Sequence, residues 1–428
     1  KRLWREVLEN NIYVLCKTPM SAAITRRTLA GYDEHATVNV AHIEDLVAKL
    51  RGDTPYVGYN IENELREKFE LAEGEKVKFT AIVGNPPYQI ANENNKMSRS
   101  IYPLFVDESV KLADYVSLIM PARWMSGEDG PYKETSGFVG RMKGFGIEKF
   151  VLHPDSQEVF KGVDIKGGVC YFLLNRNHQD NTRYTLIEHG HTSEQLTDFN
   201  NPLDNNIIIR YPELDSIVEK IDFRAVGAGF KESLASMKTL VSSRNPYGFI
   251  SDLFTKNNEK VERISEDRRA DDDWQIIGLL KGKRVRRFIP HNALKKNVQG
   301  AMSYKVLLPR ANGSGVFGEV FSTPMLGAPM LISTDTFLEV GQFNNEHEAA
   351  NLLKYVKTKF FRAMVGVKKT AVFNYKDAFT FVPIQDFTAN SDIDWTKSIA
   401  EIDQQLYHKY SLTQEEIDFI ETKVKSME

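Results

Sequence analysis

The stretch Ala81-Ile82-Val83-Gly84-Asn85-Pro86-Pro87-Tyr88 changes abruptly from apolar residues to a rigid polar loop. Residues 81–84 are small or β-branched, which is typical of a strand buried on both faces of a parallel sheet. The two prolines cannot continue a strand ladder, because they have no N–H group and a fixed φ angle. Asn85 is therefore predicted to lie where a strand ends and a loop begins, the usual place for a ligand site in an open α/β sheet.

The loop offers a set of groups that suits a planar amine. Asn85 contributes a side-chain oxygen, Pro86 a carbonyl oxygen and Tyr88 a flat aromatic face. Two acceptors and a stacking ring fit the amino edge of a nucleobase. The residues leave open a structural alternative, a Pro-Pro turn with an asparagine cap.

Asn85-Pro86-Pro87-Tyr88 after an apolar strand resembles the catalytic motif of amino-methyltransferases, and the whole chain resembles restriction–modification N6-adenine DNA methyltransferases with a gamma-like motif order. The resemblance implies that these four residues are catalytic and that S-adenosylmethionine (SAM) is the methyl donor. Hydrogen bonds from the target amine to Asn85 and Pro86 would localise its lone pair, a preorganised electrostatic effect. The same four residues occur in methyltransferases that act on protein glutamine, so they fix the chemistry better than the substrate.

The resemblance also implies residues beyond the motif. Phe160, ahead of a strand predicted at 169–174, would stack on a flipped-out adenine, and the alternative is a core phenylalanine. The implied cofactor-side residues are Cys16, Thr18, Met20, Tyr102 and Phe105. For Tyr102 and Phe105, a core position at helical spacing is the more frequent case.

One expected feature is missing. The family's SAM loop, an Asp-Pro-x-x-Gly-x-Gly type of turn, should precede residue 11 and does not occur there. Three explanations remain open: the chain begins inside the catalytic domain, another chain supplies the loop, or cofactor binding has been lost. We favour the first, because residue 1 is predicted to lie inside a helix. Gly227 and Gly229 form a compact glycine pair, but without a strand–turn–helix context.

Composition indicates a globular protein without a membrane segment. The 428 residues are 42% hydrophobic and 26% charged, with a formal net charge of −3. No run approaches the ~18 apolar residues of a membrane span, and no signal peptide opens the chain. The only two cysteines, Cys16 and Cys170, are far apart, which favours reduced thiols in a cytoplasmic protein and no metal site. The charge gives no global attraction to DNA, so a DNA-binding surface must be local.

The order of apolar segments predicts the domains. Alternating strands and helices between residues 11 and 190 predict an α/β fold, a doubly wound Rossmann-like methyltransferase domain over residues 1–228. An α+β target-recognition domain is predicted over 229–390 and a helical tail over 391–428, whose last helix is capped by Thr413 and Glu416. The polar run 92–99 predicts a mobile loop beside the motif, and the asparagine-rich segment 200–206 predicts a boundary.

Basic residues of the second domain predict its ligand. Two basic runs interleaved with aromatic residues and Asn/Gly loops suit contacts with double-stranded DNA, whereas any single run is more often a solvated face. The candidate DNA-binding residues are Arg244, Lys283, Arg284, Arg286, Arg287, Lys295 and Arg310.

The leading hypothesis is therefore a site-specific DNA adenine-N6 methyltransferase of a restriction–modification or related phage-defence system. A cognate nuclease or helicase subunit is an implied partner; no nuclease motif is found in this chain. The alternatives are a non-catalytic DNA-binding specificity subunit and an amino-methyltransferase acting on RNA or protein.

Overall fold

The computed structural model describes residues 2–31, 33, 35–72, 74, 76–92, 95–127, 135–199, 207–221, 236–255, 264–312, 316–369 and 374–427. The chain divides into two compact units. The first comprises residues 1–120, 129–152 and 169–198, and the second comprises 121–128, 153–168 and 199–428. The predicted boundary at residue 228 and the glycine pair at 227 and 229 lie outside the described residues, as does the predicted boundary segment 200–206.

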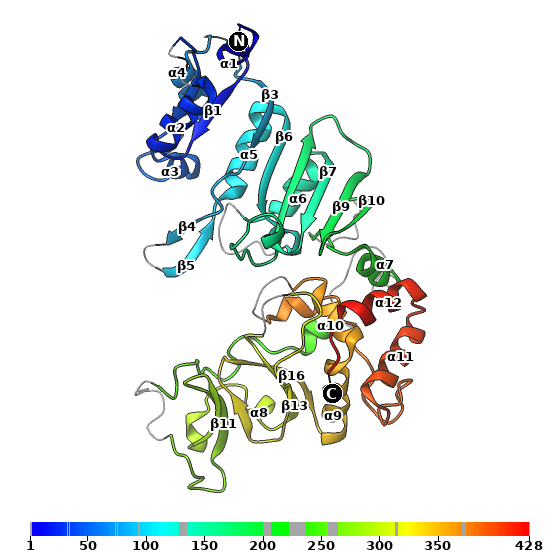
Figure 1. Cartoon of the computed structure of the whole chain (residues 1–428). Helices are drawn as coiled ribbons and strands as arrows, with labels where there is room; N and C mark the ends of the chain where they lie inside the picture. The colour runs from blue at the N-terminus through cyan, green and yellow to red at the C-terminus, as the bar shows by residue number, and fades with distance from the viewer. Residues whose placement is uncertain are drawn as a thin grey trace. The chain divides into compact units, whose positions relative to one another are not determined.

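The first unit is a mixed α/β structure (Figure 1). Its elements are α1 (Arg2–Asn10), β1 (Tyr13–Cys16), α2 (Pro19–Ala30), β2 (Asn39–His42), α3 (Leu46–Arg51), α4 (Ile61–Phe69), β3 (Phe79–Gly84), β4 (Gln89–Asn92), β5 (Asn95–Ser100), α5 (Tyr102–Leu112), β6 (Ala113–Pro121), α6 (Phe138–Gly144), β7 (Ile147–His153), β8 (Val169–Asn175), β9 (Thr182–Glu188) and β10 (His191–Thr197).

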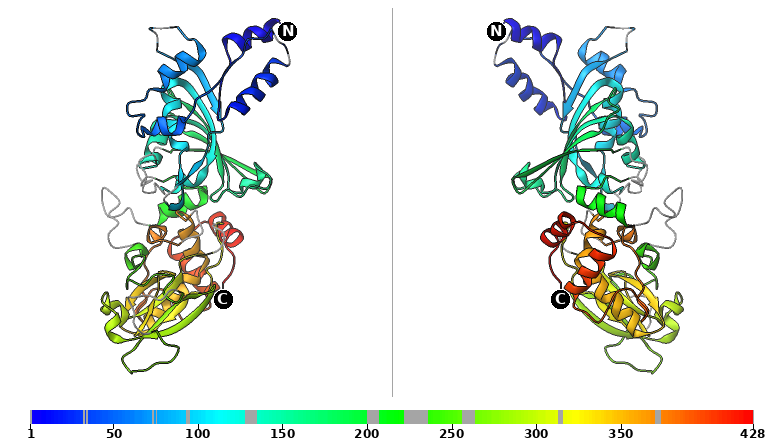
Figure 2. Two further views of the ribbon diagram at one scale, coloured as in Figure 1. Left: turned by 90° about the vertical axis from the view of Figure 1, so that its left-hand side faces the viewer. Right: turned by 90° about the vertical axis from the view of Figure 1, so that its right-hand side faces the viewer.

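The beginning of the chain forms a small parallel sheet with helices beside it. β1 pairs with β2, and α2 starts at a capping box in which Thr18 and Ser21 each bond the other's backbone N–H. Figure 2 shows α1 and α2, both dark blue, side by side. The Trp4 indole donates to the Leu29 carbonyl, and Arg5 pairs with Asp33 just beyond α2. The helix predicted at the beginning of the chain is α1.

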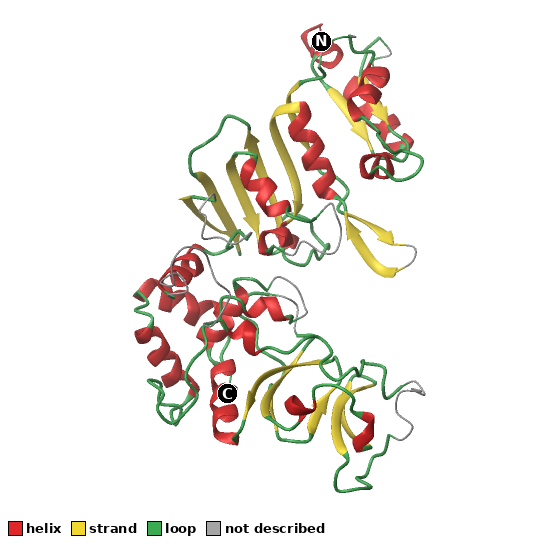
Figure 3. Cartoon of the chain, turned by 180° about the vertical axis from the view of Figure 1, so that it is seen from behind, coloured by secondary structure: helices red, strands yellow, loops and turns green. Residues whose placement is uncertain are grey.

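Six of the described strands form a second sheet in the order β10-β9-β7-β8-β6-β3. β3 runs parallel to β6, and β7 runs parallel to β9. Figure 3 shows α5 and α6 on one face of this sheet. The two helices meet at Tyr102 and Phe138, whose rings are 5.9 Å apart in an edge-on contact, so this face holds a packed core.

β3 differs from its prediction. It is a strand, as expected, but Ala81 is exposed and Val83 is 75% exposed, so it is not buried on both faces. The face of the strand on which Ala81 and Val83 lie is left exposed, and β3 is also at the edge of the sheet, with β6 as its one paired neighbour among the described strands. On the other side, Phe79 packs against Tyr13 of β1, with ring centroids 5.5 Å apart, without a ladder between the two strands.

Described residues of the run predicted as a mobile loop form a strand: β5 pairs with β4, Ser100 opposite Gln89 and Arg99 opposite Ile90, while residues 93 and 94 lie outside the described residues. The Ser98 hydroxyl donates to the Gln89 side chain at 2.8 Å. Polar residues can form a strand where cross-strand pairs satisfy them, which the polarity of the run alone did not indicate.

The second unit contains two three-stranded sheets, β12-β11-β15 and β14-β13-β16, among its described residues. The helix α9 packs on β13 and β16. The helices and strands of the second unit are α7 (Pro212–Lys220), β11 (Trp274–Leu280), β12 (Lys283–Ile289), α8 (Val298–Ala301), β13 (Tyr304–Pro309), β14 (Met325–Gly327), β15 (Leu331–Ser333), β16 (Phe337–Phe343), α9 (Glu346–Lys357), α10 (Lys359–Gly366), α11 (Ile399–Lys409) and α12 (Gln414–Lys423).

The end of the chain is part of this unit and does not form a separate tail. Thr413 and Glu416 form the predicted capping box of α12. The buried Glu416 also accepts from Ser216 at 2.6 Å and pairs with Lys220 at 2.5 Å, both on α7. These contacts join α7 to α12, so residues from 199 onward group with the second unit and not with the predicted domain 1–228. No described helix is both long and apolar enough to cross a membrane.

Candidate functional site

The loop that follows β3 leaves the motif accessible. Asn85 is exposed, and Pro86 and Pro87 are half-buried. The loop is fixed at its far end, because the Ile101 N–H donates to the Tyr88 carbonyl at 3.0 Å. The asparagine side chain thus projects from a loop held between β3 and the start of α5. This is the arrangement required of a hydrogen-bond acceptor for an incoming amine.

Tyr88 combines an available ring with an unusual hydroxyl. The side chain is half-buried, and its hydroxyl oxygen is buried with no hydrogen-bond partner among the described residues. Burial, with a smaller effect of the Cys170 thiol, raises the pKa of Tyr88 to about 12. The hydroxyl therefore remains protonated near neutral pH and contributes little to holding the ring in place.

Phe160 lies in the loop between β7 and β8, which belongs to the second unit. It is half-buried in a tight turn: its N–H donates to the Ser156 carbonyl at 2.8 Å, and its carbonyl accepts from Val163. The Ser156 hydroxyl closes the turn by donating to the Val163 carbonyl. Because Tyr88 and Phe160 belong to different units, their pairing across an adenine remains a prediction.

The five candidate cofactor residues differ in accessibility. Thr18 and Met20, at the start of α2, are exposed, Met20 by 74%, and Phe105 is half-buried. Cys16 ends β1, and its thiol lies 3.6 Å from the Thr25 hydroxyl. Tyr102 is 2% exposed and packs in the core, the structural alternative weighed for this residue. Leu15 and Met20 expose apolar surface at the end of β1 and the start of α2, the kind of surface that an adenosyl group would need.

The predicted DNA-binding residues of β12 separate into two groups. Lys283 and Arg286 are exposed. Arg284 donates to the carbonyls of Ser322 and Thr323, and Arg287 pairs with Glu266 at 2.6 Å. Arg284 and Arg287 thus have partners within the unit. Lys283, Arg286 and Lys295 are exposed and available to a ligand.

Arg244 and Arg310, which are 66 positions apart, approach the same carboxylate. Asp335, between β15 and β16, places its Oδ2 atom 3.4 Å from Arg244 and 3.7 Å from Arg310. The Asp335 side chain is 7% exposed, whereas that of Arg244 is 70% exposed. Sequence patterns did not predict Asp335, because a single aspartate between two strands reads as an ordinary turn residue.

A buried polar network lies in the same unit. Lys305 is 0% exposed and donates to the Gly300 carbonyl at 2.7 Å, with its Nζ atom 3.8 Å from Glu339. Glu339 accepts from the Tyr247 hydroxyl at 2.6 Å and from Ser333 at 2.9 Å. Burial raises the pKa of Glu339 and lowers the pKa of Lys305, and their mutual attraction opposes both shifts. The network is a structural brace between β13, β16 and the segment around Tyr247.

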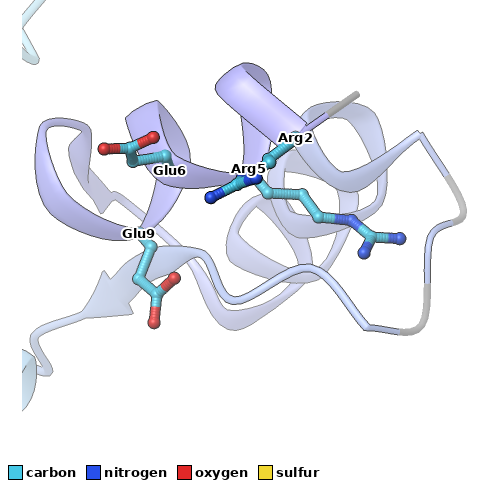
Figure 4. Close-up of a pocket in the computed structure, with 4 residues that line it drawn as sticks. All are labelled: Arg2, Arg5, Glu6 and Glu9. Atoms are coloured by element: carbon cyan, nitrogen blue, oxygen red, sulfur yellow. The ribbon is translucent and has the colours of Figure 1, made fainter.

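A pocket of about 640 Å³ lies against α1 and is lined by charged side chains alone (Figure 4). Arg5 is bonded to Asp33, and none of the candidate site residues lines this pocket. Among the described residues, no three His, Cys, Asp or Glu side chains are grouped as metal ligands. We assign no function to the pocket, whose lining residues are Arg2, Arg5, Glu6 and Glu9.

Comparison with known proteins shows that the segment containing the motif is similar to restriction-modification and adenine-specific methylases. Residues 10–141 match the Eco57I restriction-modification methylase family. Over 110 residues the chain is 32% identical to an uncharacterized adenine-specific methylase of Mycoplasma pneumoniae, a match that covers 25% of this chain and 26% of that protein. The chain thus spans about a quarter of the length of this curated relative.

The chain is also similar to two solved structures of restriction-modification enzymes. The type IIL restriction-modification enzyme MmeI in complex with DNA gives a TM-score of 0.45 at 8% identity, covering 94% of this chain and 63% of that one. A nuclease-deletion mutant of the type ISP enzyme LlaGI gives 0.43 at 11% identity, covering 88% and 40%. The predicted resemblance is confirmed by the sequence matches: the part of the chain from residue 10 to residue 141, which contains Asn85-Pro86-Pro87-Tyr88, is related to the restriction-modification methylases of the Eco57I family.

Proposed function

We propose that this protein is a site-specific DNA methyltransferase that transfers a methyl group from SAM to adenine N6 in a restriction–modification or related phage-defence system. The first unit is the catalytic domain, of doubly wound Rossmann-like type, and the second unit recognises the DNA target. The observation that carries the proposal is the exposed Asn85 at the end of β3, in a motif that lies within the matched segment.

The motif lowers the barrier by positioning acceptors. The amine of adenine is a poor nucleophile, because its lone pair is delocalised into the ring. Asn85 Oδ1 and the Pro86 carbonyl accept its two N–H groups and favour a tetrahedral nitrogen with a localised lone pair. Such preorganised electrostatic stabilisation needs no general base with a shifted pKa.

SAM supplies an electrophilic methyl group when bound. Thr18 and Met20, exposed at the start of α2, and the half-buried Phe105 are the residues of this chain that would contact its adenosyl part. Cys16 lies beside them at the end of β1. The buried Tyr102 would support Phe105 from within the core.

Adenine must leave the duplex to reach Asn85, which costs a few kcal/mol. We propose that Tyr88 and Phe160 stack on the extruded base, which returns about 1–3 kcal/mol per aromatic contact. Replacing Tyr88 by phenylalanine should preserve this function, because the lost hydroxyl is buried without a described partner and its removal costs no hydrogen bond. Tyr88→Ala and Phe160→Ala should each weaken the extruded state.

The measurement is the fluorescence of 2-aminopurine at the target position together with the methylation rate. The fluorescence should rise on binding of the unmodified protein and of Tyr88→Phe, and should rise less with the alanine variants. If Phe160→Ala leaves both the fluorescence and the turnover unchanged, Phe160 is a core residue and does not stack on the base.

The exposed basic residues of β12 should contact DNA phosphates. Replacing Lys283 and Arg286 by alanine should lower the log–log salt dependence of DNA binding by about 0.9 per lost contact. The matched pair Arg284→Ala and Arg287→Ala should change it less, because both side chains already have partners within the unit. An equal decrease of the salt dependence in both double variants would contradict the division of β12 into residues that contact DNA and residues with partners inside the unit.

Transfer of labelled methyl groups from SAM separates the proposed function from its alternatives. The complete gene product is incubated with duplex DNA, RNA and a protein extract, and label is expected in DNA. Label in RNA or protein would favour the other amino-methyltransferases. Absence of SAM binding by calorimetry, with DNA binding retained, would identify a non-catalytic specificity subunit.

A further inference from the structure

The segment that carries Arg244 is fastened at both ends to the sheets of the second unit. Val241 bridges to Val340, and the Ser242 hydroxyl accepts from the Glu339 N–H at 3.0 Å. At the other end, the Phe249 carbonyl accepts from the Asp335 N–H at 2.9 Å. Arg244 lies between these attachments, so its backbone is held while its side chain is 70% exposed.

The carboxylate beneath Arg244 is equally fixed. Asp335 lies in the short turn between β15 and β16, whose Thr334 N–H donates to the Ile277 carbonyl of β11. Arg310 approaches the same oxygen from the end of β13, and its backbone bonds the Thr336 carbonyl and the Asn374 N–H. The other oxygen, Oδ1, has no hydrogen-bond partner among the described residues. Two guanidinium groups thus share one oxygen of one buried carboxylate.

The shared carboxylate serves to orient the arginine side chains and does not strengthen their attraction to an anion. A buried carboxylate reduces the net positive charge of the cluster, which weakens attraction to a phosphate. What it adds is direction, because an arginine held at one nitrogen presents its remaining N–H groups in a defined plane. Directed pairs of N–H donors are what a guanine edge requires, since its O6 and N7 acceptors bind arginine bidentately in the major groove.

We propose that Arg244 reads a guanine in the DNA target and that Asp335 is the positioning residue that orients it. This inference rests on the proposed function, since it names part of the target that the second unit recognises. It predicts at least one guanine in the recognition sequence, outside the methylated adenine.

The test uses a randomised duplex DNA library. The complete gene product selects bound duplexes, which are sequenced to give the preferred bases, and the salt dependence of binding is measured in parallel. The variants are Arg244→Lys, which keeps the charge and loses the bidentate fork, and Asp335→Asn, which keeps the shape and loses the charge. Arg269→Lys is the matched control, because it makes the same change at an exposed arginine of the second unit that is not among the candidate DNA-binding residues.

The unmodified protein and Arg269→Lys should select the same sequence. Arg244→Lys and Asp335→Asn should lose preference at one guanine, by roughly 5- to 150-fold, with the salt dependence unchanged. If Asp335→Asn does not fold, Arg244→Lys carries the test, because its side chain is exposed.

Two results would overturn the inference and leave the proposed function standing. One is an unchanged selected sequence for Arg244→Lys, and the other is an Arg244→Ala variant that lowers the salt dependence with unchanged base preference, which would make Arg244 a phosphate contact. A library in which the unmodified protein selects no sequence would overturn site-specific recognition itself, and the inference with it.

Discussion

Replacing Asn85 by alanine is expected to lower the rate of methyl transfer roughly 100- to 1000-fold while DNA binding stays within a few-fold. The loss corresponds to about 3–4 kcal/mol, the typical effect of removing one preorganised hydrogen-bonding group where charge develops. Asn85 is exposed at the end of β3, so its truncation should not disturb the core. Single-turnover methylation and equilibrium DNA binding measure the two effects separately.

Two further variants sharpen this test. Asn85→Asp keeps an acceptor oxygen and should retain more activity than the alanine variant. Asn177→Ala changes an exposed asparagine in the turn between β8 and β9 and should have no effect. Full activity of Asn85→Ala would remove this residue from catalysis.

Replacing Lys305 by methionine should destabilise the protein by about 3–5 kcal/mol. The substitution leaves Glu339 buried without its cationic partner, and an uncompensated buried charge carries a cost of this size. Because Glu339 also holds Tyr247 and, through its backbone, Ser242, the segment that carries Arg244 should loosen as well. Urea unfolding followed by near-ultraviolet circular dichroism measures the change in the free energy of unfolding.

The double variant Lys305→Met with Glu339→Gln is the control. It removes both charges and keeps one acceptor oxygen for either Tyr247 or Ser333, while its amide NH2 donates to the hydroxyl of the other, so it should recover much of the lost stability. A loss below about 1 kcal/mol in the single variant would mean that the pair is worth no more than an exposed one.

Local features of this chain could be predicted from the sequence because their causes are local. The Thr413 cap bonds a residue three positions on, and the last helix begins where the cap predicts. The strand before Asn85 was located by its apolar run and the prolines that end it. The loop with the Asn85 and Pro86 acceptors could be predicted from the same stretch, because it depends on four consecutive residues alone.

Features that depend on distant neighbours could not be predicted in the same way. The exposure of Val83 depends on whether other elements cover its face of the sheet, which the sequence of the strand does not contain. Arg284, Arg286 and Arg287 look alike in sequence, and their different roles come from Ser322, Thr323 and Glu266. Asp335 meets Arg244 across 91 positions, so no spacing pattern could have paired them.

The most direct test of the central claim is mass spectrometry of nucleosides from duplex DNA incubated with SAM and the complete gene product. We expect N6-methyladenine in DNA, formed by the unmodified protein and reduced at least 100-fold by Asn85→Ala. N4-methylcytosine would keep the chemistry of the motif and contradict the proposed base. DNA free of methylated nucleosides, under conditions in which the protein binds both SAM and DNA, would contradict the proposed function.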